Sequence, residues 1–595
     1  MTATLLLASA FGFAKIYTGG FGDNTGLGPQ PDPYGAPRSC HTFECYVPFA
    51  EHGKVHPEWF SYVKAANRRG GGSSGGQLCF TNPELRRFMK KRLRAYIEND
   101  RRESRRDVPY LYDISQNDNT DYCECAECLA AREKWGLSGL LVDFINDIAS
   151  SVTNDYPNVL VNTFAYQGTE APPKGGMRAA DNVVIRLCDT QSNQAAGRNE
   201  PGNTVFRDNL VAWAKCAKHI SVWDYFSTYT ADLVGLPYAS EFHIGDYMRM
   251  CRDNRVIGIF REHEHQHKGD FWELKNHLSV ELIKDPNADD RVLMHSFLRD
   301  YYGPAADEMY AYRRCLDDLR RERGGKIPWF PSLSDWDWFD IAAVAECQAL
   351  FERALAKDLS PEFALRVRRA RLGLDRLVCR RALGAGRWDA AAMAARERVK
   401  AVTPVWYARF AETPFMKKNP HAVADDIAQV CGMPPPKKFA GQNIHDFTAP
   451  MLYVVETAVE RTLRLRDDPQ SECGRAWILD ADASKHDKLP FEIGFYDRVA
   501  KKFVARRTFD RPLAKDAYAW YELGEVTVPG PSLMYVSGSW NIQLDLRRCT
   551  DLHGRKFNFW VSAKLTGRKY GEGDDSPSRV YVDRVVLVES KGDER

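Results

Sequence analysis

Between residues 15 and 262, short β-rich runs alternate with helical stretches, and this alternation constrains the fold more than any other feature of the 595-residue chain. It is typical of parallel βα units, in which a helix follows each strand and covers the sheet. The runs predicted as strands are residues 15–17, 41–49, 110–115, 159–166, 183–188, 220–226 and 256–260. Seven such runs predict an α/β fold, a (β/α)8 barrel of the TIM type that lacks its first strand.

A doubly wound open sheet is the alternative fold for the same alternation. That fold places a glycine-rich phosphate-binding turn after an early strand. The glycine-rich stretch at residues 68–76 has neither the dinucleotide-binding spacing nor the Gly-Lys-Ser/Thr ending of a phosphate loop. We therefore favour the barrel and interpret this stretch as a loop.

The apolar residues 2–14 allow two interpretations. They have the length of a signal-peptide apolar region, which predicts a periplasmic or secreted protein, but no Lys or Arg precedes them. The interpretation we favour is a recorded start that falls inside the barrel domain, which leaves a cytoplasmic location open. No apolar run reaches the roughly 18 to 20 residues that a membrane span needs.

Two further domains are predicted after the barrel, which we assign to residues 1–275. Apolar residues that recur at every third or fourth position predict a helical domain over residues 276–435. Apolar residues that alternate at period two, as in residues 557–565, predict a β-sandwich of jelly-roll form over residues 436–595. This last domain is expected either to bind carbohydrate or to support the barrel.

The charge balance argues against a nucleic-acid partner. The chain carries 82 basic and 80 acidic side chains, so no net field attracts a polyanion. The basic segment at residues 86–106 also contains acids, and we interpret it as the solvated face of an outer helix. Aromatic residues make up 12% of the chain, which suits a protein that stacks sugar rings, although most aromatic residues fill cores.

Carboxylates follow three of the predicted strands. In a parallel barrel the site forms at the carboxyl-terminal ends of the strands, so polar residues just past each apolar run are the informative ones. Asp118, Asp224 and Glu262 stand at such positions. Cleavage of a glycosidic bond needs one carboxylic acid to protonate the leaving oxygen and a second carboxylate to activate water or attack directly. We predict Asp118 as the acid, and Asp224 or Glu262 as the base or nucleophile.

Other polar and aromatic residues near the strand ends are predicted to hold the substrate. They are His41, Tyr46, Gln116, Asn117, Asn119, Tyr166, Gln167, Arg186 and Tyr225. Arg186 would suit the carboxylate of a uronic acid, because a guanidinium binds a carboxylate through two parallel hydrogen bonds. Packing within the barrel is the alternative role for each of these side chains.

Two patterns resemble metal sites. His263, His265 and His267 occupy alternate positions, as paired histidines do in metal-dependent hydrolases, so such a hydrolase is an alternative function. Cys123, Cys125 and Cys128 lie within six residues of one another, which fits a structural zinc with a fourth ligand from elsewhere, a disulfide, or free thiols. A zinc ion or a disulfide here would fix the loop that carries Asp118. No cofactor is expected to be needed for catalysis.

Several motifs in order give the chain a family resemblance. They are H-T-F at 41–43, H-P-E-W-F at 56–60, Q-L-C-F-T-N-P-E at 77–84, S-Q-N-D-N at 115–119, Y-C-E-C-A-E-C at 122–128, V-I-R-L-C at 184–188, W-D-Y at 223–225, G-I-F at 258–260 and Y-Y-G-P-A-A at 301–306. Over roughly residues 40–310 the chain resembles the bacterial "domain of unknown function 4838" family, which is grouped with glycosidase barrels similar to α-glucuronidases and hexosaminidases. The chain departs from the family after G-I-F, where Arg261 replaces the usual Glu and Glu262 follows.

The resemblance implies a barrel and a glycan partner. Taken with the carboxylates, it predicts a glycoside hydrolase that acts by general acid/base catalysis on an oligo- or polysaccharide, one that contains uronic acid. A non-catalytic glycan-binding protein on a barrel scaffold is the alternative from a different class. The sequence leaves the linkage and the oligomeric state open.

Overall fold

The computed structural model describes residues 15–20, 34–37, 40–70, 76–103, 108–230, 232–385, 390–432, 436–439, 442, 444–454, 463–471, 474–480, 491–497, 502–509, 516–528, 530, 532–535, 542–546, 552–566 and 579–590. The interpretations of residues 2–14 and of the centre of the glycine-rich stretch fall outside these residues. The chain divides into two compact units. The first comprises residues 1–234, 238–331 and 335–364, and the second comprises the remainder. The domain boundaries near 275 and 435 stay predictions.

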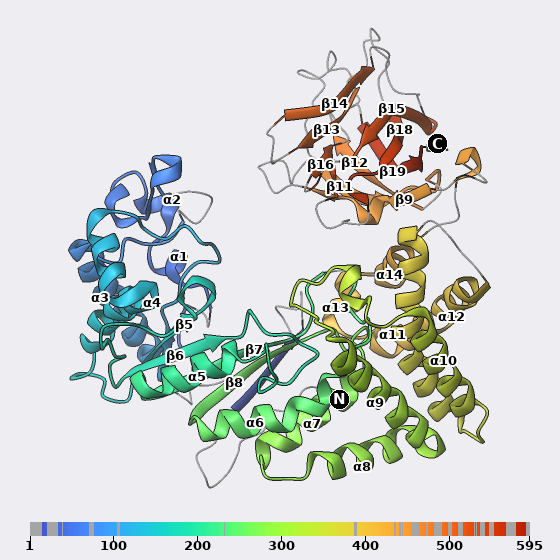
Figure 1. The fold of residues 1–595 in the computed structure, drawn as a ribbon. Helices are drawn as coiled ribbons and strands as arrows, with labels where there is room; N and C mark the ends of the chain where they lie inside the picture. The colour runs from blue at the N-terminus through green and yellow to red at the C-terminus, as the bar shows by residue number, and fades with distance from the viewer. Residues whose placement is uncertain are drawn as a thin grey trace. The chain divides into compact units, whose positions relative to one another are not determined.

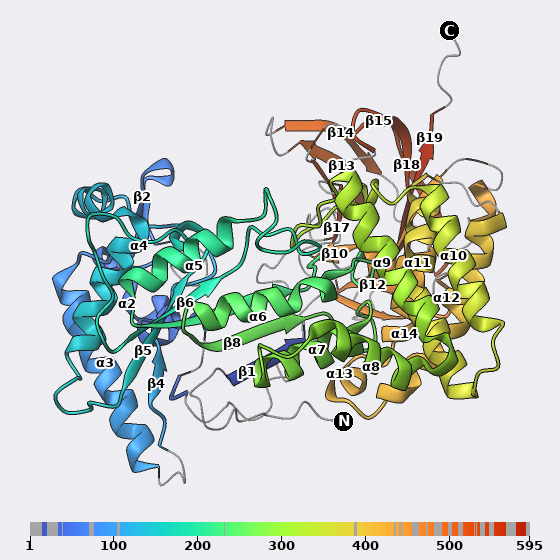
Figure 2. The ribbon, with the colours of Figure 1, turned by 60° about the horizontal axis from the view of Figure 1, so that its bottom comes forward.

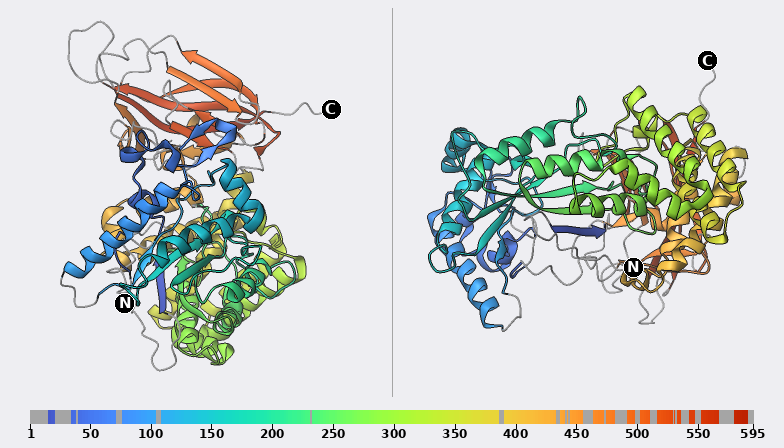
Figure 3. Two further views of the ribbon diagram at one scale, coloured as in Figure 1. Left: turned by 90° about the vertical axis from the view of Figure 1, so that its left-hand side faces the viewer. Right: turned by 90° about the horizontal axis from the view of Figure 1, so that it is seen from below.

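A curled parallel sheet forms the centre of the first unit (Figure 1). Its strands are β1 (Lys15–Gly20), β4 (Leu111–Asp113), β5 (Leu160–Ala165), β6 (Val183–Cys188), β7 (His219–Phe226) and β8 (Val256–His263). The order across the sheet is β1-β8-β7-β6-β5-β4, so β1 lies at one edge, dark blue in the right-hand view of Figure 3. Six of the seven predicted strands are therefore confirmed.

This strand order distinguishes between the two predicted folds. A doubly wound sheet reverses its strand order at a switch point and carries helices on both faces. Here β4 to β8 follow the chain order without reversal, and the first strand pairs with the last, as in a barrel. Within the described residues β1 and β4 remain the two edges, with Tyr34 bridged to Leu111 of β4. Closure into an eight-stranded barrel stays a prediction.

Helices cover one face of the parallel sheet. Helix α4 (Ala126–Ser150) packs on β5 and β6, α5 (Val205–Cys216) on β7, α6 (Ile244–Asp253) on β8, and α7 (Trp272–Lys284) on β1. Figure 2 shows α5 and α6 lying along this face. Outside them, α3 (Pro83–Arg102) packs against α4. The buried side chains of α3 recur every four residues, as expected for one face of a helix: Leu85, Met89, Leu93 and Ile97.

The strand predicted at residues 41–49 is wrong. This segment forms two short helices, α1 (Phe43–Tyr46) and α2 (Phe49–His52). The buried residues Phe43, Tyr46 and Val47 recur at intervals of three and four, and α1 packs on α3. Pro48 also disfavours a central strand, because it has no amide hydrogen to donate to a ladder.

A two-stranded sheet of β2 (Tyr62–Val63) and β3 (Arg68–Arg69) completes the strands of the first unit. The part of the first unit that follows β8 is helical: 3-10 segments accompany α8 (Asp290–Tyr302), α9 (Ala306–Arg323) and α10 (Ile341–Leu355). Helix α11 (Pro361–Ala385) begins in this unit and continues into the second. Helices α12 (Ala390–Tyr407), α13 (Pro414–Lys418) and α14 (Ala422–Cys431) follow. The predicted helical region is thus confirmed as helices. Among the described helices, none combines the length and apolar character that crossing a bilayer demands.

Two antiparallel sheets end the chain. One has the order β10-β17-β16-β13-β14 and the other β11-β12-β19-β18-β15, with β9 paired to β19. Their bounds are β9 (Ile444–Thr448), β10 (Tyr453–Val454), β11 (Leu463–Asp467), β12 (Arg475–Asp480), β13 (Phe491–Asp497), β14 (Lys502–Phe509), β15 (Ala519–Thr527), β16 (Ser532–Tyr535), β17 (Ile542–Asp545), β18 (Lys556–Thr566) and β19 (Arg579–Glu589). Ile493 and Phe495 of the first sheet share one apolar core with Phe557 and Phe559 of the second. The jelly-roll form stays a prediction.

Candidate functional site

The register of the parallel strands divides their side chains between two faces of the sheet. Paired residues in a parallel sheet point to the same side, and successive residues point to opposite sides. Tyr225 pairs with Glu262, whereas Asp224 pairs with Arg261. Tyr225 and Glu262 therefore share the face away from the helices, which we call the inner face, and Asp224 lies on the helix-covered face.

Glu262 stands at the carboxyl-terminal end of β8 on the inner face. Its Oε2 accepts a 3.3 Å hydrogen bond from the indole Nε1 of Trp223 and a second hydrogen bond from the Tyr229 hydroxyl. Burial raises the pKa of Glu262 to about 7, and the hydrogen bond from Trp223 opposes this rise only in part. The carboxyl group therefore keeps its proton to a higher pH than an ordinary glutamate does.

Asp118 lies in the loop after β4 and is exposed. Its Oδ1 accepts a 3.0 Å hydrogen bond from the Tyr166 hydroxyl, which in turn accepts a 2.8 Å hydrogen bond from Nε2 of Gln167. Burial and the nearby charge of Asp118 raise the pKa of Tyr166 well above its usual value. Tyr166 thus remains a neutral donor that holds Asp118 in place.

The buried side chain of Tyr225 feels the charge of both carboxylates. Burial raises its pKa well above the usual value, and the charges of Glu262 and Asp118 are among those that raise it further. The two acids therefore lie within electrostatic reach of the same buried hydroxyl. Tyr225 belongs to a group of packed rings that we call the aromatic cluster, made up of Phe164, Tyr166, Trp223, Tyr225, Tyr229 and Trp329.

The aromatic cluster offers ring planes close to Glu262. The ring centroids of Tyr225 and Trp329 lie 4.9 Å apart, and those of Tyr229 and Trp329 lie 5.7 Å apart. A backbone hydrogen bond of 2.7 Å from the Tyr229 amide to the Trp329 carbonyl joins the two loops. Aromatic faces of this kind pack against the C–H faces of sugars.

Arg186 of β6 packs against rings of the aromatic cluster. Its guanidinium carbon is 5.2 Å from the centroid of Tyr34, 5.7 Å from that of Phe164 and 5.8 Å from that of Trp223. Trp223 therefore touches both the guanidinium and the carboxyl group of Glu262. The site thus combines an acid and a fixed positive charge across one indole ring.

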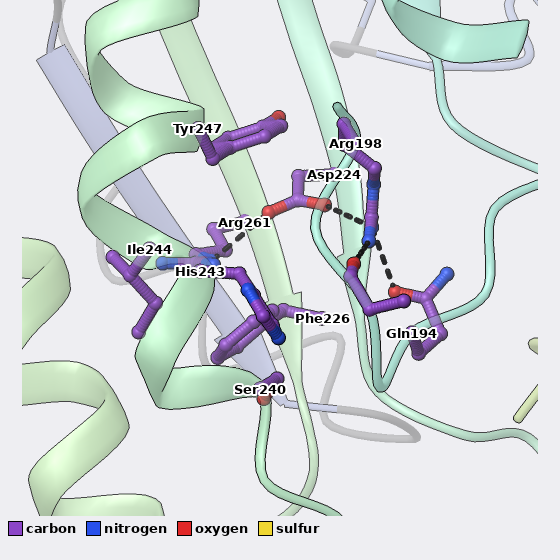
Figure 4. A pocket seen from close by; sticks show the side chains of 10 residues that line it. Gln194, Arg198, Asp224, Phe226, Ser240, His243, Ile244, Tyr247 and Arg261 are labelled. Carbon is purple, nitrogen blue, oxygen red and sulfur yellow. Dashed lines mark hydrogen bonds and ion pairs between the residues drawn. The ribbon is translucent and has the colours of Figure 1, made fainter. Parts of the chain in front are cut away.

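Asp224 is buried on the helix-covered face, opposite Glu262. Its Oδ2 lies 3.0 Å from Nε of Arg261 and its Oδ1 lies 3.8 Å from Nη2 of Arg198. Figure 4 shows the carboxylate between the two guanidinium groups, in a small pocket that Tyr247 of α6 also lines. Burial raises the pKa of Asp224, and the two arginines oppose that rise. The structure does not bring Asp224 together with Asp118 and Glu262.

Several residues predicted to bind substrate have partners within the protein. Asn117 and Asn119 both bond with Gln77, whose Nε2 donates to their backbone carbonyls at 2.7 and 2.8 Å. The Gln116 side chain donates to Oγ1 of Thr169 at 2.9 Å. These amides shape the loop that carries Asp118.

His41 and Tyr46 have different surroundings. The Nδ1 of His41 lies 2.8 Å from the carbonyl oxygen of Gln116, and its ring centroid is 6.0 Å from that of Tyr166, so His41 borders the site. Tyr46 is fully buried on α1 and packs edge-on against Tyr96, at 5.1 Å between centroids. Its place is in the core between helices.

Three residues of the candidate site were not among those predicted from the sequence: Trp223, Tyr229 and Trp329. Trp223 stands beside Asp224 in the W-D-Y motif, so the motif pointed to this part of the chain. Successive side chains of a strand point to opposite faces, and only the folded sheet shows that Trp223 faces the site. Tyr229 follows β7 in the first unit, and Trp329 lies 100 residues later. No local pattern pairs residues that are so far apart in sequence.

The histidine run does not assemble a metal site in the described part of the chain. Nδ1 of His263 accepts a 3.0 Å hydrogen bond from Nε1 of Trp272, and burial lowers the His263 pKa to about 4. The rings of His265 and His267 stack at 5.1 Å. The groups of described residues that could hold a metal do not include these three histidines, whereas one such group joins Cys79 to Cys123, Cys125 and Cys128.

The fold and the site define an α/β protein with a barrel-like parallel sheet, whose strand ends carry two carboxylates and an aromatic cluster. Its sequence matches the family described as "Domain of unknown function (DUF4838)" over residues 19–314, and this part of the chain belongs to that family. The resemblance inferred from the motifs is therefore confirmed. The comparison with curated proteins gives no match.

Among solved structures, the chain is similar to a family GH115 4-O-methyl-α-glucuronidase with specificity for decorated arabinogalactans. That likeness has 11% identity and a TM-score of 0.37, and covers 88% of this chain and 68% of the other. A family 89 glycoside hydrolase from Clostridium perfringens, in complex with PUGNAc, is similar at 12% identity and a TM-score of 0.33, over 54% of this chain. The chain spans 37% of the length of that second protein.

Proposed function

We propose that this protein is a glycoside hydrolase in which Glu262 is the general acid and Asp118 is the second carboxylate. The observation that carries the proposal is the position of Glu262 at the end of β8, where Trp223 and Tyr229 both donate to its Oε2 and burial raises its pKa to about 7. A proton donor works best when its pKa lies near the working pH, and glycosidases raise the pKa of one carboxyl group for this purpose. This assignment exchanges the roles predicted from sequence, where Asp118 was the acid.

The hydrogen bonds of Glu262 favour the role of donor. Both Trp223 and Tyr229 donate to Oε2, and within the described residues no hydrogen bond to Oε1 is found. A proton carried by Glu262 therefore resides on Oε1, where it can pass to a leaving oxygen. Asp118, exposed and oriented by Tyr166, would activate water or attack the anomeric carbon.

We further propose that the glycan contains a uronic acid. Arg186 is buried at 4% exposure among aromatic rings on the inner face, so its charge acts in a poorly hydrated environment. A guanidinium in such a setting recognises a sugar carboxylate more strongly than it would in water. A neutral sugar would gain nothing from this charge.

The test uses aryl glycosides of uronic acids and of neutral sugars, with good and poor leaving groups. Glu262→Gln is expected to lower kcat by about 100-fold or more for a poor leaving group and only slightly for a good one, because a good leaving group needs no proton. Asp118→Asn is expected to lower kcat for both kinds of substrate. Wild-type protein that binds these glycans without any turnover would overturn the proposal in favour of a binding protein.

Glu264→Gln provides the matched control. Glu264 lies two residues beyond Glu262 and is buried, but its Oε1 accepts a 2.9 Å hydrogen bond from Thr228 rather than from the aromatic cluster. This variant is expected to keep the leaving-group dependence of the wild type. The same leaving-group dependence in both variants would remove Glu262 from the role of acid.

A further inference from the structure

Four cysteines from two distant segments meet beside the loop of Asp118. Cys79 precedes α3, Cys123 and Cys125 precede α4, and Cys128 lies in the first turn of α4. All four Sγ atoms lie within 4.8 Å of one another, and three of the four residues are buried. The sequence cluster of three cysteines thus gains a fourth member from 44 positions upstream of Cys123.

The separations fit a tetrahedral zinc ion. Sγ of Cys79 lies 3.7 Å from Sγ of Cys125 and 3.9 Å from Sγ of Cys128. Four thiolates at about 2.3 Å from one zinc ion are separated by about 3.8 Å along each edge of the tetrahedron. A disulfide needs about 2.05 Å. We infer that Cys79, Cys123, Cys125 and Cys128 bind one zinc ion.

Polar groups lie beside two of the sulfur atoms. The backbone amide of Tyr62 donates to Sγ of Cys123 at 3.4 Å, and Oγ1 of Thr81 lies 3.2 Å from Sγ of Cys128. Cys125 is the N-cap of α4, so it and Cys128 lie at the positive end of the helix dipole. Four protein thiolates leave no coordination position for water or substrate, so the zinc is structural rather than catalytic.

The metal would fix the loop that carries Asp118. Cys79 is two residues after Gln77, whose side chain bonds with the backbone of Asn117 in both directions, at 2.7 Å from Nε2 and 3.1 Å to Oε1. Cys123 holds the other end of the same loop. Zinc therefore joins the Gln77 segment and the end of the loop into one rigid frame around Asp118.

Metal analysis of the 595-residue protein, purified without chelator, tests this inference. One zinc ion per chain is expected, released when a mercurial reagent modifies the thiols. Cobalt substitution is expected to give the intense visible bands of tetrahedral thiolate coordination. Protein without metal, protein with iron instead of zinc, or a mass that reports a disulfide among these four cysteines would each overturn the assignment.

Variants separate the zinc site from the proposed catalysis. Cys79→Ser is expected to lose at least 10-fold in zinc affinity, whereas Cys216→Ser, which alters a cysteine on α5 outside the cluster, is expected to keep one zinc ion per chain. Removal of zinc is expected to increase hydrogen exchange in residues 116–121. Unchanged zinc affinity in Cys79→Ser would overturn the inference, and none of these measurements depends on glycosidase activity.

Discussion

The hydroxyl of Tyr166 donates a 3.0 Å hydrogen bond to Oδ1 of Asp118, and so joins the end of β5 to the loop after β4. This contact orients an exposed carboxylate towards the aromatic cluster. Gln167 supports the same contact, because its side-chain amide donates a 2.8 Å hydrogen bond to the Tyr166 hydroxyl. Two residues predicted to bind substrate therefore serve to position Asp118.

Tyr166→Phe removes this hydrogen bond while it keeps the ring. A hydrogen bond to a charged group contributes about 1.5 to 3 kcal/mol, so kcat/KM is expected to fall by about 10- to 100-fold. Steady-state kinetics on an aryl glycoside measures the change. Tyr110→Phe, at an exposed tyrosine, is the control and is expected to behave as wild type. Equal kcat/KM in both variants would show that Asp118 does not depend on Tyr166.

The stability of the protein is expected to depend on pH through Glu262. Its folded pKa of about 7 lies above the ordinary value of 4.5, so the folded protein retains a proton that the unfolded chain releases. Stability from this group is therefore full below pH 4.5 and falls as the pH rises through 7. Glu262→Gln should gain stability relative to wild type over this range, by at most about 3 kcal/mol. Denaturant unfolding at pH 4.5 and pH 8 measures the gain, and a constant difference would contradict the assigned pKa.

Arg186→Lys keeps the positive charge but replaces the planar guanidinium group with an ammonium group. For a uronic acid substrate KM is expected to rise by about 10-fold or more, because an ammonium group cannot form two parallel hydrogen bonds to a carboxylate. For the corresponding neutral glycoside KM should change little. Kinetics on the matched pair of substrates gives the result. Equal effects on both substrates would assign Arg186 to packing alone.

Asp224→Asn tests the correction to the predicted triad. The change leaves Arg261 buried without its 3.0 Å partner, and breaking one side of a buried ion pair costs about 3 to 5 kcal/mol. The melting temperature is therefore expected to fall by several degrees, while kcat of the folded protein stays within a few-fold of wild type. A normal melting temperature with lost turnover would instead return Asp224 to the active site.

Much of the fold followed from the sequence, because local periodicity reports which face of each element is buried. The parallel strands, the helices after residue 275 and the alternating run at Phe557 and Phe559 all carry such a pattern. The apolar residues Phe43, Tyr46 and Val47 predict a strand at 41–49 although the segment is helical, because a four-residue helix is too short to show a full helical repeat.

The candidate site followed only in part. The rule that active-site residues follow the strand ends selected Asp118 and Glu262, but it also selected Asp224. Adjacent residues in a strand point to opposite faces, and the sequence does not show which of them faces the site. Register decides the face, and register is set by pairing between β7 and β8. Trp329 and Cys79 reach their sites through contacts across many residues, which no local pattern encodes.

The sequence by itself determined the order of strands and helices, the family, and the acids at the strand ends, since each of these depends on residues that are close along the chain. The tertiary structure decided that Glu262 faces the aromatic cluster, that Asp224 is held between Arg261 and Arg198, and that Cys79 completes the cysteine group. Burial raised the pKa of Glu262, and burial is a property of the packed chain rather than of any local segment.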